Sequence, residues 1–454
     1  MRLRPRRTST APSTATSTAT RTDTDPASPL RSRALWLVPS LAVTLVMGCL
    51  AATYLGGLVN TDANLSGFPL AVVNDDRGAT APDGTTVDVG DQIADSLVAG
   101  LDGDEFDVEV LSAAEADERM GAGTLYGVVL LPESLSADLL GWAAAVTSPA
   151  DPDAATPAPT VELATNTRAG SMAAGIASAA GQRALAEVDA AVGEQVTAQV
   201  RAQLAASGAD GLSAVEAAAL ATPLDIEVSA YDPLPAGTGR GLSAFYYALL
   251  LVMAGFSGSI GATTLIDARL GFVPDEMGPR YRHRPHSGLS RRTTLVVKWG
   301  VMALSAALVS TVYLAVGAAL GMPIDHPWVL WAFGVAMIWS IAVVVNAVNA
   351  LVGNLGMTVN LFIFIVLALP SAGGTLPLEA VPPFIRWLGS FEPMHQVYVG
   401  ARAILYFDAG WDAGLGRALA AAGIAAALGL VVGLVGTRAY DRRGLARVHR
   451  AVVA

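Results

Sequence analysis

The chain has 454 residues, 53% of them hydrophobic, and its mean hydropathy of +0.48 excludes an ordinary soluble enzyme. Its net charge of −11 is divided unevenly, because residues 60–240 carry 28 acidic and 6 basic side chains whereas the rest carries 11 and 22. The chain is therefore an acidic block, with a balance of −22, among basic flanks with a balance of +11. A single cysteine, Cys49, excludes an intrachain disulfide and a cysteine-based metal site.

The N-terminal 33 residues are rich in Ser, Thr and Pro, so we expect a disordered cytoplasmic tail at 1–33. The apolar stretch that follows, 34–59, is long enough to cross a membrane, which needs about 20 apolar residues. It continues well past Cys49, whereas the apolar part of a signal peptide ends after about 7–15 residues, so we expect a retained span. Five more windows qualify, and they lie at 242–266, 299–320, 328–351, 356–374 and 414–437.

The arginines predict the orientation of these six spans. They gather in the N-terminal tail, in the loop after the second span and in the C-terminal tail, residues 438–454. Positively charged segments stay in the cytoplasm. We therefore expect a multi-pass protein of the cell membrane, with both termini cytoplasmic and residues 60–240 outside.

The acidic block, residues 60–240, alternates between strand and helix patterns. Short apolar runs predict strands at 70–73, 106–111, 125–131, 160–164 and 224–230. Helical spacing predicts helices at 89–101, from Ser112 to about 121–123, at 169–206 and at 212–221. A Pro- and Ala-rich linker separates the third and fourth strands, at 147–159. The fold class is thus a six-span polytopic α-helical membrane protein with an inserted extracytoplasmic α/β domain, which has a mainly parallel or mixed sheet and a long helix.

The first predicted strand ends in a polar motif, Val73-Asn74-Asp75-Asp76, followed by Gly78. Two adjacent carboxylates after a strand could hold Mg²⁺ or Ca²⁺. However, neighbouring side chains of an extended chain point in opposite directions, and Asn and Asp favour turns because they bond their own backbone. We favour a structural turn over an ion site.

Several spans contain polar or small residues in the middle of apolar sequence. Asn346 and Asn349 lie three residues apart on one face of the fourth span, and Asn360 lies in the fifth. Glycines form faces on the second span and on the sixth, at Gly255, Gly258, Gly261, Gly429 and Gly433. Such faces indicate close helix contacts, and a dimer interface is the alternative use of them. For the asparagines, helix contact is favoured and a substrate path is the alternative.

The segment after the fifth span is too apolar for an ordinary loop and too rich in Pro and Gly to span. Irregular backbone at membrane depth is tolerated only when protein buries it. We expect a re-entrant segment at 375–402, made of short helices and anchored by Trp387 and Phe391.

No motif for chemistry is present. The lone lysine, Lys298, does not lie in a phosphate-binding loop, and no zinc-protease helix or serine nucleophile elbow appears. His283 and His286 are close together, but in a basic loop they are expected to be solvated. We therefore expect no enzyme, no catalytic residue, no cofactor, no metal ligand and no nucleic-acid partner.

Two groups of motifs resemble a known superfamily. Ser371-Ala-Gly-Gly-Thr-Leu-Pro377, Pro382, Phe391-Glu392-Pro393 and Arg402 resemble the closing region of ABC-2-type transporter permeases, Gly373 and Gly374 included. The stretches LAVVNDDRGA, VDVGDQIADSLV and AGTLYGVVLLPESLS resemble its YhgE/Pip branch, which is named after a phage infection protein. The resemblance covers most of residues 34–437 and includes the layout of one span, an outer domain and a five-helix membrane domain, 242–437. The outer domain is shorter than in many relatives.

The resemblance implies an export permease among membrane lipids, acting as a homodimer or as a heterodimer with a related permease, and powered by a separate ABC ATPase. In such permeases the cytoplasmic loop after the second span contacts the ATPase, which implies that role here for Asp275, Glu276, Arg280, Arg282, Arg284, Arg291 and Arg292. The alternative is that these arginines only fix the orientation.

Two functions remain at this point. The first is an ABC-2-type permease subunit that exports an unknown substrate. The second is a membrane scaffold or surface receptor without transport, phage-receptor-like or secretion-accessory, which acts through its outer domain.

Overall fold

The computed structural model describes residues 33–58, 61–81, 84–101, 103–147, 156–207, 211–445 and 447. Most of the predicted N-terminal tail, much of the linker and the last residues of the C-terminal tail lie outside this described part. The chain forms two compact units, residues 1–48 and 49–454. Helix α1 (Arg33–Leu58) begins in the first unit, and the other elements that the structure describes belong to the second.

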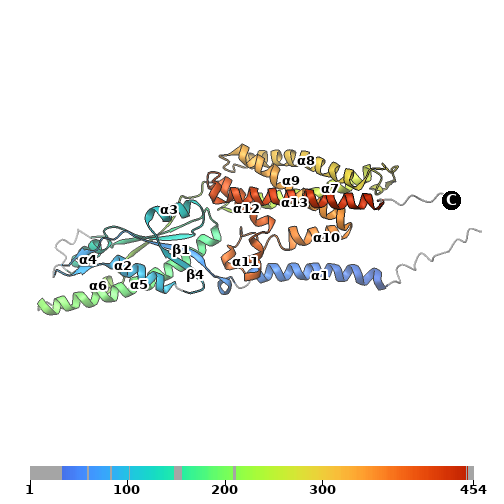
Figure 1. Ribbon diagram of the computed structural model, residues 1–454. Coiled ribbons are helices and arrows are strands. Elements are labelled where there is room, and N and C mark those ends of the chain that lie inside the picture. The colour runs from blue at the N-terminus through green and yellow to red at the C-terminus, as the bar shows by residue number, and fades with distance from the viewer. Residues whose placement is uncertain are drawn as a thin grey trace, which may run out of the picture. The chain divides into compact units, whose positions relative to one another are not determined.

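An α/β region is built on a five-stranded sheet with the order β4-β1-β5-β6-β7 (Figure 1). Its strands are β1 (Phe68–Asn74), β4 (Phe106–Val110), β5 (Gly127–Leu131), β6 (Thr160–Thr165) and β7 (Asp225–Ala230). Strand β1 is parallel to β4 and β5, β6 is antiparallel to β5, and β7 is parallel to β6. The sheet is therefore mixed, and each of the five predicted strands is present.

Both faces of this sheet are covered by helices. Along β1, successive side chains point to opposite faces: Ala71 and Val73 pack against α3 (Ala113–Gly121), and Val72 belongs to the larger core on the other face. Helices α2 (Val89–Gly100), α4 (Leu135–Thr147), α5 (Ser171–Ser207) and α6 (Ala214–Leu220) contribute to that larger core. Strand β1 is consequently buried on both faces, as its run of apolar residues predicts.

Local capping explains where the shorter helices begin. Helices α3 and α6 each start with a complete capping box, formed by Ser112 with Glu115 and by Ser213 with Glu216. Hydrogen bonds from Ser112 lower the pKa of the Glu115 carboxyl. The sequence did not predict α4, nor the small antiparallel pair β2 (Ala79–Thr80) and β3 (Thr86–Val87).

In the described part of the chain, four helices are long and apolar enough to cross a membrane: Leu242–Arg269, Arg291–Ala319, Pro327–Val352 and Trp411–Arg442. They are α7 (Leu242–Arg269), α8 (Arg291–Ala319), α9 (Pro327–Val352), and the short π-helix η5 (Trp411–Leu415) with α13 (Gly416–Arg442). Helix α9 is the most buried of them. By contrast, α8 and α13 expose large apolar side chains at helical spacing, Leu304, Leu308 and Val312 on α8 and Leu428, Val431 and Val435 on α13. Such faces suit lipid rather than water.

The fifth predicted span is shorter as a helix than its window, 356–374. Helix α10 (Leu355–Leu361) continues as the π-helix η3 (Phe362–Val366), and turns follow. Leu355–Val366 rises only about 18 Å at 1.5 Å per residue, less than a bilayer core of about 30 Å. Pro370 and Gly373, whose φ is +73°, prevent the helix from continuing. Helix α1 likewise holds a shorter apolar stretch, Ser40–Gly56, so six spans remain a prediction.

Several of the glycines in the spans serve contacts within the chain. A methyl group at Gly255 would lie 2.7 Å from Cβ of Ile341 on α9, and one at Gly429 would lie 2.8 Å from Val343. The same change at Gly433 would reach Trp299 on α8. These residues let neighbouring helices approach closely. They therefore give no support to the predicted dimer.

Candidate functional site

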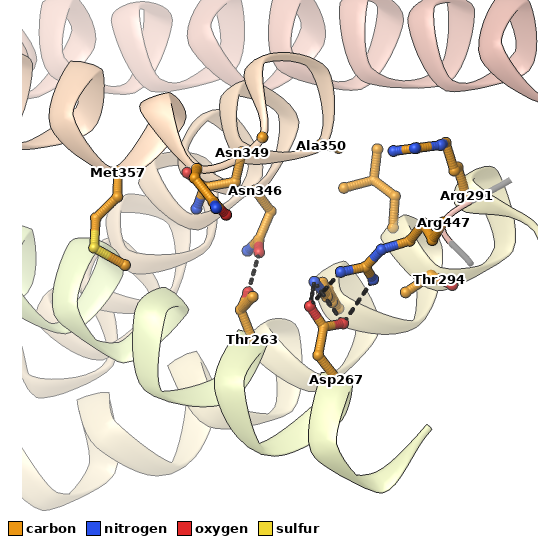
Figure 2. Close-up of a pocket in the computed structure, with 13 residues that line it drawn as sticks. Thr263, Asp267, Arg291, Thr294, Asn346, Asn349, Ala350, Met357 and Arg447 are labelled. Atoms are coloured by element: carbon orange, nitrogen blue, oxygen red, sulfur yellow. Dashed lines mark hydrogen bonds and ion pairs between the residues drawn. The ribbon is translucent and has the colours of Figure 1, made fainter. Parts of the chain in front are cut away.

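A pocket of about 350 Å³ lies where the ends of α7 and α9 meet the start of α8, beside α10 and Arg447 (Figure 2). Its walls differ in chemistry. One is charged, with Asp267, Arg291, Lys298 and Arg447, and another carries amides, those of Asn346, Asn349 and Asn354. Leu295, Ala350 and Met357 add apolar surface.

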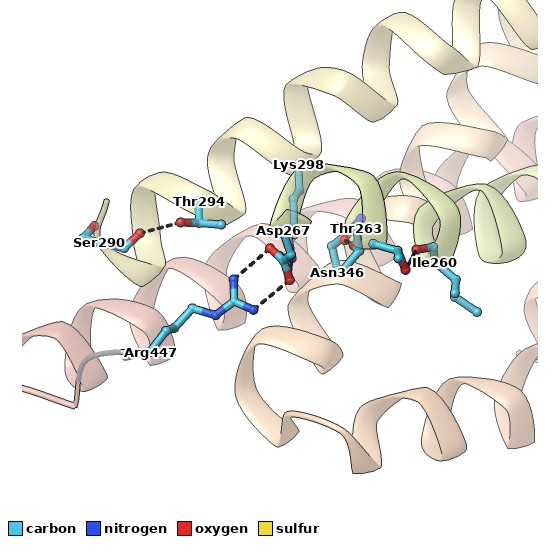
Figure 3. Close-up of polar contacts among 9 residues, drawn as sticks. Ile260, Thr263, Asp267, Ser290, Thr294, Lys298, Asn346 and Arg447 are labelled. Atoms are coloured by element: carbon cyan, nitrogen blue, oxygen red, sulfur yellow. Dashed lines mark hydrogen bonds and ion pairs between the residues drawn. The ribbon is translucent and has the colours of Figure 1, made fainter. Parts of the chain in front are cut away.

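The charged wall is centred on Asp267, at the end of α7. Its carboxylate binds Nζ of Lys298 at 3.0 Å and accepts two hydrogen bonds from Arg447, at 2.8 and 2.7 Å (Figure 3). Only 8% of the Asp267 side chain and 11% of the Lys298 side chain are exposed. A buried carboxylate is tolerable when cations and hydrogen bonds compensate it, and the paired bonds from one guanidinium also fix the geometry.

The amide wall contains the predicted asparagines. Thr263 donates to Oδ1 of Asn346 at 2.9 Å, and the Asn346 amide donates to the carbonyl of Ala342. Asn360 donates to the Asn349 side chain at 3.1 Å and to the carbonyl of Val345. The structure thus brings Asn346, Asn349 and Asn360 together, and the first two line the pocket. Oδ1 of Asn360, fully buried, has no hydrogen-bond partner among the described residues.

The end of α13 is attached to the start of α8 beside the pocket. The carboxylate of Asp441 accepts hydrogen bonds from the backbone N–H groups of Arg291 at 3.0 Å and Arg292 at 3.1 Å. The first N–H groups of a helix lack partners within it and favour negative charge, so Asp441 completes the N-terminus of α8. Arg447 also stacks over the ring of Phe272. Sequence reasoning used the C-terminal charges only for orientation and missed these contacts.

The predicted ATPase-coupling loop contains a hairpin. Strands β8 (Asp275–Met277) and β9 (Arg280–Arg282) pair in antiparallel fashion. Met277 and Tyr281 expose 71% and 69% of their surface. Among the other residues predicted for this role, Glu276 lies on β8 opposite Tyr281, Arg284 lies 3.9 Å from Asp275, and Arg291 and Arg292 begin α8. The predicted residues therefore fall into a hairpin group and a helix group.

The predicted re-entrant segment consists of short helices, η4 (Leu378–Ala380), α11 (Pro383–Gly389) and α12 (Pro393–Tyr406). Gly373 precedes them in the left-handed region, and Gly374 lies so close to Phe245 that a larger residue would displace that ring. Glu392 caps α12, accepting from the backbone N–H of His395 at 3.1 Å, and Pro393 occupies the first turn. Phe384, Trp387 and Phe391 form an exposed aromatic cluster, which suits a membrane interface.

The segment also contacts the α/β region. Arg402 donates to the carbonyl of Ala169 at 2.8 Å and stacks over Tyr398 and Phe407. Arg168 donates to the carbonyl of Tyr406, also at 2.8 Å. A third contact joins Tyr126 to the carboxylate of Glu379 at 3.1 Å, and burial, with this carboxylate, raises the pKa of the Tyr126 phenol. The predicted residue Arg402 is thus a link between regions, and Pro377 immediately precedes η4.

The motif after β1 is a turn whose polar groups are used by the fold. The backbone N–H of Asp76 donates to Oδ1 of Asn74 at 3.1 Å, and the Asp76 carboxylate accepts from the backbone N–H groups of Gly90 and Ser136, each at 3.1 Å. Those two groups lie at the starts of α2 and α4. Gly78, with φ +65°, completes the turn. In the part of the chain that the structure describes, no three His, Cys, Asp or Glu residues are grouped to hold a metal ion.

A comparison with models of protein families identifies the family of this chain. The family model described as "ABC-2 family transporter protein" matches residues 37–437. The chain belongs to this ABC-2 transporter family. Membership, together with the apolar helices, makes it a multi-pass membrane protein of the permease type found in ABC export systems. No curated protein and no solved structure matches the chain.

Proposed function

We propose that this ABC-2 family member is the permease subunit of an export system driven by a separately encoded ATPase. The observation that carries the proposal is the family match over residues 37–437. The chain has no Gly-x-x-x-x-Gly-Lys-Ser/Thr sequence, so the energy of ATP hydrolysis by that route must come from another protein. Resemblance to the YhgE/Pip branch supports a large outer domain, which we assign to residues 60–240, and a dimer of permease chains.

In the proposed topology, α1, α7, α8, α9, α10 and α13 correspond to the six windows, both termini are cytoplasmic and the α/β region is outside the cell membrane. The charge division supports this arrangement, since the acidic block is separated from the arginine-rich segments. The exposed aromatic cluster on the re-entrant segment fits the outer interface.

The β8–β9 hairpin is the part that we assign to ATPase coupling. It lies between α7 and α8 in the chain, so a movement of the hairpin would act on the ends of two spans. Exposed Met277 and Tyr281 give it the apolar and aromatic contact surface that is enriched at protein interfaces, and Arg280 and Arg282 add charge.

Co-purification tests the proposal. Tagged protein in a mild detergent should retain an ABC ATPase, and replacing Arg280, Arg282 and Arg284 by Gln should reduce the retained amount at least several-fold. The matched control replaces Arg438, Arg442 and Arg443 by Gln, which removes the same charge from the end of α13. If no ATPase is retained under any mild condition, the transporter loses its energy source and the proposal is wrong. Equal losses of ATPase in both variants would contradict the assignment of the hairpin to the ATPase interface.

A further inference from the structure

The pocket described above has an excess of positive charge. Arg291, Lys298 and Arg447 carry three positive charges, and Asp267 is the single acidic residue among the lining residues. Lys298 and Arg447 both pair with that carboxylate. A balance of two positive charges is therefore left in a pocket whose other lining residues are uncharged.

Among the three cations that line the pocket, Arg291 is the one without an ion-pair partner in the described part of the chain. Its Nε donates to the carbonyl of Leu445 at 2.7 Å, and its guanidinium lies over the Tyr440 ring. Within the described residues, no carboxylate lies at ion-pair distance from the Arg291 guanidinium. The Asp441 carboxylate accepts hydrogen bonds from the backbone N–H groups of Arg291 and Arg292, not from their side chains. A guanidinium with free N–H groups that lines a pocket suits a phosphate, which it can bind through two parallel hydrogen bonds.

The opposite side of the pocket is amphipathic. Figure 2 shows Asn346, Asn349 and Met357 across from Arg291 and Arg447. The amides can bond polar parts of a ligand, while Met357 on α10, which lines the pocket, is an exposed apolar residue. A cationic end and an apolar edge at the end of membrane helices match a phosphate carried on an apolar chain.

We propose that this pocket binds a phosphate group, contacted by Arg291, and that the permease carries molecules that bear one. The second half of this statement rests on the proposed export function. The first half does not, because it concerns the pocket alone. A lipid headgroup and a soluble phosphate share the recognised chemistry, and the apolar edge favours the lipid. A cavity of about 350 Å³ is in the range of small-ligand sites and large enough for a headgroup.

Binding to the purified full-length protein tests the site without any ATPase. In one arm, native mass spectrometry in detergent measures retention of dioleoyl phosphatidylglycerol against dioleoylglycerol, which has the same acyl chains and no phosphate. In the other, inorganic phosphate is titrated against the same protein. We expect selective retention of the phosphatidylglycerol, and a loss of affinity of about tenfold in Arg291→Gln.

Arg292→Gln is the matched control, because it removes the same charge one residue away, outside the pocket lining, and leaves the backbone bond to Asp441 in place. It should bind like the unmodified protein. Arg291→Lys should recover only part of the affinity, because an ammonium keeps the charge but cannot form the paired hydrogen bonds of a guanidinium, and thermal unfolding of each variant verifies that it is folded.

Selective lipid retention that depends on Arg291 supports the proposal with a lipid source. Saturable phosphate binding with the same dependence supports it with a soluble source. Equal losses in Arg291→Gln and Arg292→Gln, or no loss in either, would overturn it. Since ATPase co-purification is measured separately, a failed binding test leaves the export function standing, and an absent ATPase leaves the phosphate site standing.

Discussion

Two aspartates, the half-buried Asp76 in the α/β region and the buried Asp267 in the helical region, show how differently the two regions compensate a carboxylate. Asp76 accepts hydrogen bonds from backbone N–H groups at the starts of α2 and α4. Asp267 is compensated by the side chains of Lys298 and Arg447 instead. A region built from short helices offers many free helix ends, whereas long membrane helices offer few, so the second acid needs cations from distant parts of the chain.

Site-directed labelling tests whether the two regions lie on opposite sides of the membrane. In a Cys49→Ser background, a membrane-impermeant maleimide should label Val215→Cys on intact cells, and should label Tyr281→Cys only after permeabilisation. Both positions are highly exposed, at 79% and 69%, so access to the side chain does not limit the reaction. Labelling of both from the same side would refute the predicted topology.

Removal of the acid in the helical region should have the largest effect on stability. Asp267→Ala leaves Lys298 and Arg447 without their counter-charge, which should cost about 3 kcal/mol or more and lower Tm markedly. Asp275→Ala is the control, because its contact with Arg284 is 3.9 Å long and more exposed. Differential scanning fluorimetry in detergent measures both. Similar small shifts in Tm for the two variants would contradict the expected cost of leaving Lys298 and Arg447 without a counter-charge.

The corresponding change in the α/β region should be smaller and local. Asp76→Ala uncaps the starts of α2 and α4, at about 1 kcal/mol for each cap. Hydrogen exchange should therefore accelerate at the amides of Gly90 and Ser136, whereas Asp75→Ala, on an exposed side chain, should leave them unchanged. Asn74→Ala should also lower stability more than it alters any metal affinity. A saturable Mg²⁺ or Ca²⁺ titration lost in Asp75→Ala would instead favour the ion site.

A third acid gives the smallest expected effect and a pH dependence. Burial raises the pKa of Asp189 on α5, although its carboxylate accepts from the backbone N–H of Leu224 at 2.8 Å. A raised carboxyl pKa means that the folded state holds the proton more tightly, so this group's contribution to stability declines as pH rises above the unfolded pKa of about 4. Asp189→Asn keeps an acceptor and removes the charge, so Tm should rise slightly at pH 7. That difference should shrink toward pH 4, and a larger gain at acid pH would contradict the assignment.

The sequence predicted the two regions to different depths. Short apolar runs located all five strands of the sheet, because one chain segment carries each signal. Helix α4 was missed because LSADLLGWAAAVT is apolar at almost every position after Asp138, which leaves no period to detect. The predicted fifth span is too long because mean hydropathy over a window hardly changes at Pro370 and Gly373, whereas these two residues prevent a helix from continuing.

Only part of the candidate site could be predicted from the sequence, because its other contacts join segments that are far apart in the chain. Asn346 and Asn349 stand out as amides inside an apolar run and could be found locally. The partnership of Asp267 with Arg447 joins residues 180 positions apart, and nothing near either residue in the sequence indicates the other. Charges that satisfy the positive-inside rule also obscure any arginine with a second role, so the sequence predicts Arg291 only as part of the coupling loop or as a charge that fixes the orientation.

The attachment of α13 to α8 has a practical side for anyone who handles this protein. Asp441 bonds to the start of α8 and Arg447 to the end of α7, so both residues take part in the folded structure. An affinity handle or fluorescent fusion that replaces these residues would remove a helix cap and an ion pair at once. A handle at this end is better added beyond Arg447, with Asp441 and Arg447 both kept.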